Sequence, residues 1–347
     1  MSDSKKPKPI IFGCAGTRLT AEERALFRRA DPFGFILFKR NCENPEQVRY
    51  LILEFKQAAG RDDVVIAIDQ EGGRVARLAP PHWPKYPAAR AFGLMYEQDP
   101  DWGIEAIRAY SRVVACELAK LGITINCAPV VDLFNPEGTP VIGDRAFSDR
   151  PGIVAGLARA QIETFLANGI LPVIKHLPGH GRLKADPHEL LPKIEASRAE
   201  LEMLDFMPFE LLKDAPLGMN SHAVFTALDP DNPASLSEIV NRDIIRGALG
   251  FDGLLLSDDL TMKALAGNPG DLARRAINAG TDVVLHCNGN ASEMAAIDMA
   301  LEPMSDAGWA RWMHAKAMIV QPNAAYNPSE DAARLDVLLG GLAAAQA

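Results

Sequence analysis

Short apolar segments alternate with amphipathic segments along the whole chain. The apolar segments run almost without polar interruption, which is typical of parallel strands covered on both faces. They predict strands at 9–15, 34–38, 64–69, 125–132, 171–176, 217–222, 253–258 and 282–286. The amphipathic segments predict helices at 20–30, 44–60, 103–121, 153–168, 198–213, 237–249, 271–279 and 291–301. For the helix at 44–60, Asn44 is the expected N-cap and Pro45 the first helical residue.

Eight predicted strands, most of them followed by a helix, give the count of a closed (β/α)8 barrel. Such a barrel uses ~250 residues, so long βα loops and the chain ends should hold the remainder of the 347 residues. We therefore predict one α/β domain over 1–347, a (β/α)8 TIM-type barrel with a core at about 9–303 and a C-terminal helical extension at about 305–347. A doubly wound open sheet is the alternative, although no Gly-x-Gly-x-x-Gly follows the first strand.

Composition and charge narrow the classes of function. The chain is 48% hydrophobic and 23% charged, as globular proteins are, and its net charge of −9 provides no basic surface for nucleic acid. No apolar run approaches the ~18 residues of a membrane span. The five cysteines are scattered without a CxxC pair, and the first residues lack the apolar region of an export signal. We therefore expect a cytoplasmic protein without nucleic-acid or membrane partners.

Charged and polar side chains gather at the ends of the predicted strands. In a (β/α)8 barrel these ends and the loops that follow them form the active site. Charged groups there must be solvated or paired, so their accumulation predicts a functional site rather than a purely structural edge. Five of the seven histidines lie at or just beyond such ends, namely His176, His180, His188, His222 and His286.

Two of these strand ends carry residues suited to covalent chemistry. Asp258 closes an apolar run, so its carboxylate is suited to attack on an anomeric carbon or to metal binding. For Asp259, capping of the next helix is at least as good an interpretation as catalysis. Lys175 has three interpretations: a Schiff-base lysine, a charged donor to hydroxyl groups, or a member of an ion pair. The nearby acidic residues favour the charged donor. Arg77 and Arg145 are suited either to a polyhydroxylated ligand or to ion pairs that stabilise loops.

A loop that contains Gly179 and Gly181 carries the triplet Asp186-Pro187-His188. An aspartate two residues before a histidine can accept a hydrogen bond from one ring nitrogen while the other faces the substrate. Alone, such a triplet is usually a surface turn. Above a barrel mouth it predicts a general acid/base.

Together these motifs resemble glycoside hydrolase family 3, specifically its single-domain bacterial β-N-acetylhexosaminidases of the NagZ type. The resemblance runs from about residue 34 to 287. It rests on 69–74 (DQEGGR), 143–145 (GDR), 175–181 (KHLPGHG), 186–188 (DPH) and 244–258, which ends in GLLLSD. Three positions depart from the family pattern: Leu177 replaces a phenylalanine, Pro187 a serine, and Ala248 a charged or amide residue.

The resemblance implies roles for particular residues. Asp258 would be the nucleophile that forms a covalent glycosyl-enzyme, and His188, oriented by Asp186, the acid/base. The sugar-binding positions would be Asp69, Arg77, Arg145, Lys175 and His176. It implies neither a cofactor nor a metal.

The leading hypothesis is a retaining exo-β-N-acetylglucosaminidase, a monomer that removes terminal GlcNAc from muropeptides (GlcNAc-anhydroMurNAc peptides) in peptidoglycan recycling, or from chitooligosaccharides. A family 3 β-glucosidase or β-xylosidase is the first alternative. A metal-dependent barrel hydrolase that uses His176, His180, His188, His222 and Asp258 is the second, and a non-catalytic sugar-binding barrel is the third. A histidine acid/base also leaves phosphate open as an acceptor besides water, because neutral imidazole repels an anion less than a carboxylate does.

Overall fold

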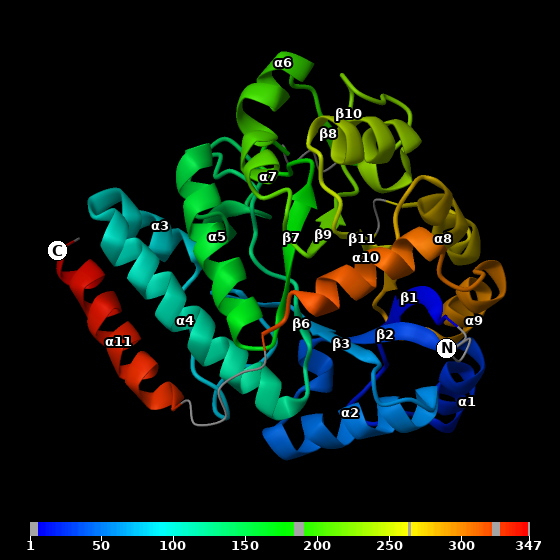
Figure 1. Cartoon of the computed structure of the whole chain (residues 1–347). Helices are drawn as coiled ribbons and strands as arrows, with labels where there is room; N and C mark the ends of the chain where they lie inside the picture. Colours follow the sequence, from blue (N-terminus) through cyan, green and yellow to red (C-terminus); the bar gives the residue numbers. More distant parts are fainter. Residues whose placement is uncertain (1–5, 184–190, 263–264, 321–326, 346–347) are drawn as a thin grey trace.

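The computed structural model describes residues 6–183, 191–262, 265–320 and 327–345. In these residues, parallel strands close into a barrel in the order β1-β12-β11-β9-β7-β6-β3-β2 (Figure 1). The strands are β1 (Lys8–Phe12), β2 (Pro32–Leu37), β3 (Val65–Ile68), β6 (Ile125–Asn126), β7 (Leu171–Leu177), β9 (Leu217–Asn220), β11 (Leu254–Asp259) and β12 (Val283–His286). The predicted (β/α)8 barrel is confirmed.

Helices surround the barrel, and two of them show how local sequence sets their ends. The first turn of α2 (Pro45–Ala59) is capped by the Asn44 side chain, which accepts from the backbone N–H of Gln47, as predicted. Thr20 and Glu23 form a capping box at the start of α1 (Ala21–Ala30). The other barrel helices are α4 (Pro100–Leu121), α5 (Pro151–Ala167), η5 (Ile239–Ala248), α8 (Pro269–Asn278) and α9 (Ala291–Ala300).

Two expectations about individual elements were wrong, and one helix was not predicted. The strand predicted at 125–132 is reduced to β6 and an isolated bridge at Val130, because Pro129 has no N–H to donate to the ladder. The helix predicted at 198–213 is divided into α6 (Arg198–Glu200), the π-type turn η3 (Leu201–Asp205) and α7 (Met207–Leu211). The helix α3 (Ala89–Gln98) was not predicted, since Ala88 at its start provides no side-chain cap.

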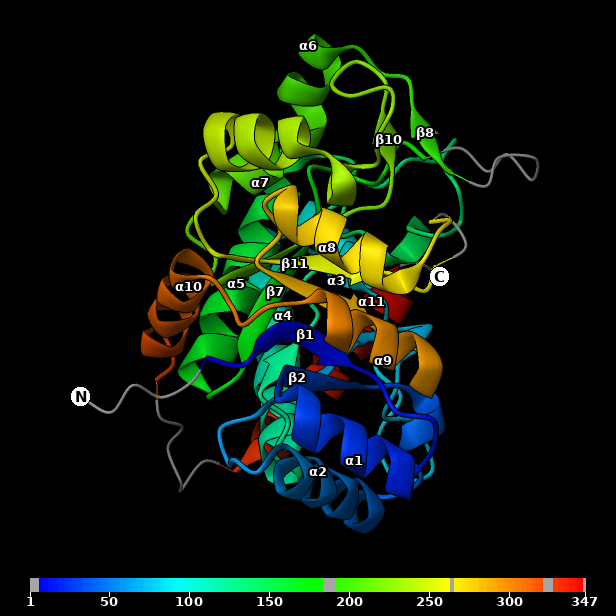
Figure 2. The same ribbon diagram turned by 90° about the vertical axis from the view of Figure 1, so that its right-hand side faces the viewer.

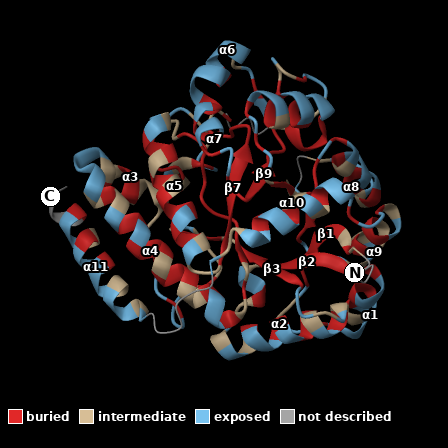
Figure 3. Ribbon diagram, viewed as in Figure 1, coloured by how far each residue is buried: buried red, intermediate tan, exposed pale blue. Residues whose placement is uncertain are grey.

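The barrel strands are largely buried, while the helices alternate between buried and exposed residues (Figure 3). The buried hydrophobic residues form an inner and an outer layer. The inner layer fills the barrel with side chains such as Ile11, Val173 and Leu256, and the outer layer joins the strands to the helices. Two further helices confirm the predicted C-terminal extension: α10 (Asp306–Ala317) and α11 (Pro328–Ala345), which packs on α4 (Figures 1 and 2). None of the described helices has the length and apolar character needed to cross a membrane.

Helix α10 closes the N-terminal end of the barrel. Its Trp312 belongs to the inner layer and meets the Phe33 ring edge-on at a centroid distance of 4.8 Å. Arg311 binds Asp252 and Asp282, which precede β11 and β12. Among the described residues, α10 therefore covers one end of the barrel, and the cavity lies at the other end, with the polar strand ends.

We expect Trp312→Ala to lower the free energy of unfolding by about 3–5 kcal/mol, because it leaves a cavity at the barrel floor. Denaturant titration followed by circular dichroism measures this. Met313→Ala on the same helix is the control, since Met313 is 48% exposed and its loss should change stability by less than about 0.5 kcal/mol. Equal effects of the two substitutions would mean that α10 does not support the barrel.

Candidate active site

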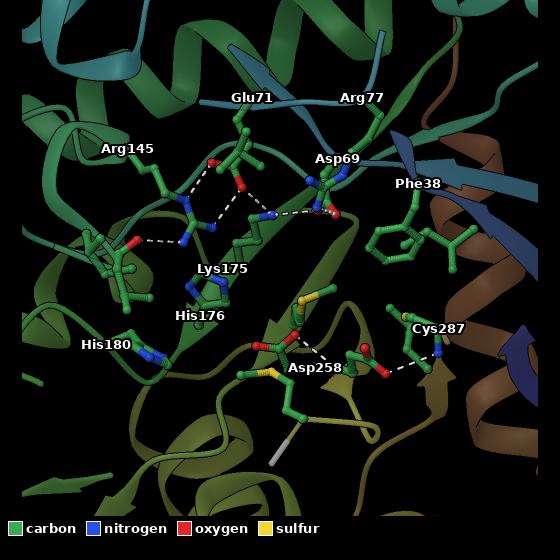
Figure 4. Close-up of a pocket in the computed structure, with 18 residues that line it drawn as sticks. Phe38, Asp69, Glu71, Arg77, Arg145, Lys175, His176, His180, Asp258 and Cys287 are labelled. Carbon is green, nitrogen blue, oxygen red and sulfur yellow. Dashed lines mark hydrogen bonds and ion pairs between the residues drawn. The ribbon is translucent and has the colours of Figure 1, made fainter. Parts of the chain in front are cut away.

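A cavity of about 270 Å³ lies at the C-terminal ends of the strands (Figure 4). Six of the residues predicted from the sequence line it: Asp69, Arg77, Arg145, Lys175, His176 and Asp258. They come from the ends of β3, β7 and β11 and from two loops, and the fold brings them together. The two other predicted residues, Asp186 and His188, lie outside the described residues.

A small hairpin after β3 shapes one wall of the cavity. It consists of β4 (Gln70–Gly72) and β5 (Val75–Ala76). The Gln70 side chain ties it together by donating to the Leu78 carbonyl at 3.0 Å and accepting from the backbone N–H of Arg77 at 2.9 Å. Gly72 has a φ of 97°, and a Cβ there would lie 2.3 Å from the Pro87 carbonyl oxygen. Glycine is therefore required for the close packing that positions Arg77.

Cations and carboxylates alternate along this wall. The Arg77 guanidinium and the Lys175 ammonium each donate to Asp69, at 2.8 and 2.9 Å. The Lys175 ammonium also lies 2.6 Å from the carboxylate of Glu71. Burial alone would lower the pKa of Lys175, but Asp69 and Glu71 raise it above its usual value. A protonated Lys175 favours the charged donor over the Schiff-base interpretation.

A second carboxylate fixes the segment that follows β7. The buried Asp132 accepts from the backbone N–H of His180 at 2.7 Å and lies 2.7 Å from Nδ1 of His176. Because a carboxylate accepts, Nδ1 of His176 carries the proton, and Nε2 is the nitrogen left for a ligand. Burial opposes ionisation of Asp132, yet the His176 ring and these hydrogen bonds lower its pKa. Asp132 therefore orients His176 towards the cavity.

Asp258 is the penultimate residue of β11, and its carboxylate lines the cavity. Oδ1 accepts from the backbone N–H of Asp259 at 2.8 Å, and no partner of Oδ2 is found within the described residues. Burial raises the pKa of Asp258, but the rings of His176 and His222 and the Asp259 N–H outweigh it, so the pKa lies below its usual value. An ionised carboxylate on a rigid strand is suited to nucleophilic attack.

Asp259 has a different environment. Its carboxylate accepts from the backbone N–H and the hydroxyl of Thr261, at 3.0 and 2.7 Å, and from the Cys287 N–H at 3.1 Å. Its carbonyl accepts from Nε2 of His222 at 3.0 Å. These bonds hold the turn after β11. The capping interpretation of Asp259 was wrong, because Asn268 caps the next described helix, α8.

Several residues of the cavity were not singled out from the sequence. Glu71 is the most prominent, and its signal was its place two residues after Asp69, which puts both side chains on one side of an extended segment. The apolar residues of the cavity could not be recognised in the sequence, because their pattern is the same as that of ordinary core residues. Phe38 and Cys287 lie on the side of the cavity away from Arg145 (Figure 4); the other apolar lining residues include Ile36, Met219, Met262 and Leu285.

Among the described residues, no three or more His, Cys, Asp or Glu side chains form a group that could hold a metal ion. The metal-dependent alternative also required His188, which lies outside them. His222 is used elsewhere, since Nδ1 lies 2.7 Å from the Ser235 hydroxyl and Nε2 bonds Asp259. The geometry of the described residues therefore gives no support to a metal-dependent hydrolase.

We expect His180 to make the protein less stable in acid. Burial and the His176 ring lower its pKa from 6.5 to about 4. Between these values the unfolded chain binds a proton that the folded protein does not, so stability falls as the pH falls through this window. The contribution is about 3 kcal/mol between pH 7 and pH 4. In urea titrations at both pH values, His180→Gln should show a loss smaller by this amount; an unchanged loss would contradict the assignment.

The sequence and the fold of this chain are similar to those of known proteins. The profile of the Glycosyl hydrolase family 3 N terminal domain matches residues 13–308. A β-hexosaminidase of Alkalilimnicola ehrlichii is 39% identical over 285 residues, which are 81% of this chain and 80% of that protein. A β-hexosaminidase of Chromobacterium violaceum is 38% identical over 300 residues, 85% of this chain and 82% of that protein. The crystal structure of NagZ from Neisseria gonorrhoeae in complex with N-trifluoroacetyl-D-glucosamine has a TM-score of 0.83 and 31% identity, and covers 98% of both chains.

A closed barrel with a carboxylate-rich cavity at the carboxyl ends of its strands has the architecture of a barrel enzyme. The family match shows that the chain belongs to glycoside hydrolase family 3. Its relatives make it a β-N-acetylhexosaminidase of the single-domain, NagZ-like kind.

Proposed function

We propose that the protein is a retaining exo-β-N-acetylglucosaminidase in which Asp258 attacks the anomeric carbon of a terminal GlcNAc. The observation that carries the proposal is the ionised Asp258 carboxylate at the end of β11, beside a wall of paired cations and carboxylates. In the first step the C1–O bond breaks and a covalent glycosyl-enzyme forms, while His188 gives a proton to the leaving oxygen. In the second step His188 takes a proton from water, which attacks C1 and releases Asp258. Asp186 orients His188 through this cycle.

The cation–carboxylate wall consists of Arg77, Asp69, Lys175, Glu71 and Arg145. It supplies the hydrogen-bond donors and acceptors that bind a sugar. The oxygens of Asp69 would accept from sugar hydroxyls, while Arg77, Arg145 and Lys175 would donate to sugar oxygens. Nε2 of His176, whose ring proton is on Nδ1, would accept from a sugar hydroxyl. The floor of the cavity is closed by residues of the barrel interior such as Met219 and Leu285. A saccharide chain therefore enters by its end, which favours release of the terminal residue.

The acetamido group and the aglycone define the natural substrate. The complex of the Neisseria gonorrhoeae relative with N-trifluoroacetyl-D-glucosamine supports an N-acylated glucosamine as the sugar in this cavity as well. We propose muropeptides (GlcNAc-anhydroMurNAc peptides) as the substrate, and with them a part in peptidoglycan recycling. A cytoplasmic location and a monomeric state stay predictions.

The first experiment compares release of 4-nitrophenol from 4-nitrophenyl β-GlcNAc, β-glucoside and β-xyloside. We expect turnover of the GlcNAc substrate and little of the other two. Activity that survives EDTA excludes the metal-dependent hydrolase, and an unchanged product in added phosphate excludes phosphorolysis. Preference for the glucoside or xyloside would replace the proposal with the alternative family 3 activity, and binding without turnover would indicate a sugar-binding barrel.

A second experiment tests the aglycone and the stereochemistry. The purified enzyme is given a GlcNAc-anhydroMurNAc peptide or chitobiose at equal concentration, and proton NMR follows the anomeric signals. We expect faster cleavage of the muropeptide and β-GlcNAc as the first product. A first product with the α configuration would contradict the retaining mechanism.

A further inference from the structure

Glu71 is the one carboxylate of the cation–carboxylate wall to which the sequence assigned no role. Its side chain is 5% exposed and lies between the two cations on the Arg145 side of the cavity (Figure 4). We propose that Glu71 is a positioning residue, which holds Arg145 and Lys175 in the orientation in which they bind the terminal sugar. This inference rests on the proposed function of the cavity.

The contacts of Glu71 are directional as well as electrostatic. Its Oε2 accepts from Nε of Arg145 and its Oε1 from Nη2, both at 2.8 Å, so one edge of the guanidinium is bound in the two-pronged geometry. A third N–H group, on Nη1, donates to the Val141 carbonyl at 3.0 Å. These bonds fix the plane of the guanidinium. They use three of its five N–H groups, so two N–H groups have no partner among the described residues. These two are available to a sugar.

Glu71 and Asp69 both bind the ammonium of Lys175. The ammonium lies 2.6 Å from Glu71 and 2.9 Å from Asp69, so neither carboxylate holds it alone. Without Glu71, Lys175 would depend on Asp69 alone, which also binds Arg77, and Arg145 would lose its carboxylate partner and keep its bond to the Val141 carbonyl. Asp69 would then have less capacity to accept from sugar hydroxyls. Glu71 therefore keeps both an acceptor and two donors available to the ligand.

The backbone that carries Glu71 is fixed from behind. The Tyr110 hydroxyl lies 2.8 Å from the carbonyl of Glu71, to which it donates. From the same hairpin, Arg74 donates to Asp144 at 3.0 Å and to the Val141 carbonyl at 2.8 Å, which joins the hairpin to the turn η2 (Gly143–Arg145). The distance between Glu71 and Arg145 is thus set by the scaffold, as a positioning residue requires.

The test measures binding of GlcNAc by calorimetry and KM for 4-nitrophenyl β-GlcNAc in Glu71→Gln. We expect the Kd of GlcNAc and the KM to rise about 10-fold or more, and kcat/KM to fall about 100-fold, because misplaced ligand groups weaken binding and the transition state together. Glu54→Gln is the matched control. Glu54 on α2 is also buried, at 3% exposure, and also binds two arginines, Arg18 and Arg24, but it does not line the cavity.

A purely structural role predicts a different result. A variant that only folds less well has a smaller active fraction, which lowers the apparent kcat and leaves KM and the Kd of GlcNAc unchanged, as we expect for Glu54→Gln. If Glu71→Gln fails to fold, Glu71→Asp takes its place, because it keeps the negative charge. The aspartate side chain is one methylene shorter and cannot keep all three contacts, so KM should rise several-fold. KM and Kd within twofold of the wild type in the folded variants would overturn the proposal. Since GlcNAc binding needs no turnover, a wild type that binds GlcNAc but does not hydrolyse 4-nitrophenyl β-GlcNAc would overturn only the proposed function.

Discussion

Replacing Asp258 with alanine should lower kcat/KM for 4-nitrophenyl β-GlcNAc by at least about 10³-fold. The variant keeps the cation–carboxylate wall but has no group to attack the anomeric carbon. Because Asp258 points into the cavity and has few bonds to the protein, the loss should appear in kcat, while GlcNAc still binds. Steady-state kinetics and calorimetry of the same preparation measure both quantities.

The neighbouring carboxylate provides the control for Asp258. Asp259→Asn removes a negative charge next to the nucleophile. Asp259 also lines the cavity, but its carboxylate is engaged by Thr261 and Cys287. We expect this variant to keep activity within about 10-fold and to lose stability instead, since a part-buried hydrogen-bond network is weakened. If Asp258→Ala were as active as Asp259→Asn, Asp258 would not be the nucleophile. Azide added to Asp258→Ala should restore turnover and give the α-glycosyl azide, because a small anion then attacks C1 from the side that the carboxylate left.

The sequence was sufficient to predict most of the cavity, because a parallel barrel places every strand end at one rim. Asp69, Lys175 and Asp258 follow apolar runs, so each could be assigned to that rim separately, before any contact was known. The same reasoning applies to Asp132, which was recognised as a strand end but given no role. Its function depends on the segment after β7, which folds back so that the His180 N–H reaches Asp132. Such long-range contacts are not encoded in a local pattern.

The sequence did not predict which charged residues of the site form ion pairs with one another. Arg145 and Glu71 are 74 positions apart and meet through the packing of a hairpin against a loop. From the sequence, either residue could equally have formed a surface ion pair. The missed helix α3 has the same kind of cause, since its start lacks a capping side chain and tertiary packing against α4 determines it. Local sequence patterns thus predicted the position of the active site, whereas tertiary contacts determine which of its residues form hydrogen bonds and ion pairs.

His188→Ala should lower kcat/KM by about 10²–10⁴-fold for a GlcNAc disaccharide, in which the leaving oxygen needs a proton. For 2,4-dinitrophenyl β-GlcNAc the phenolate leaves without help, so formation of the glycosyl-enzyme should be almost unaffected. Its hydrolysis still needs a base, and the variant should therefore show a rapid burst of phenolate followed by slow turnover. Stopped-flow absorbance resolves the two phases.

The dependence on the leaving group distinguishes acid/base catalysis from a structural contribution. Azide should accelerate the slow phase of His188→Ala and give the β-glycosyl azide, because an anion needs no base and attacks the intermediate with retention. Asp186→Asn should show the same dependence with a smaller loss, as expected of a residue that orients the imidazole. His314→Ala, which changes an exposed histidine of α10 at the other end of the barrel, is the control and should behave as the wild type. Equal losses with good and poor leaving groups would assign the proton transfer to another group, and a β-GlcNAc 1-phosphate product in added phosphate would make phosphate the acceptor.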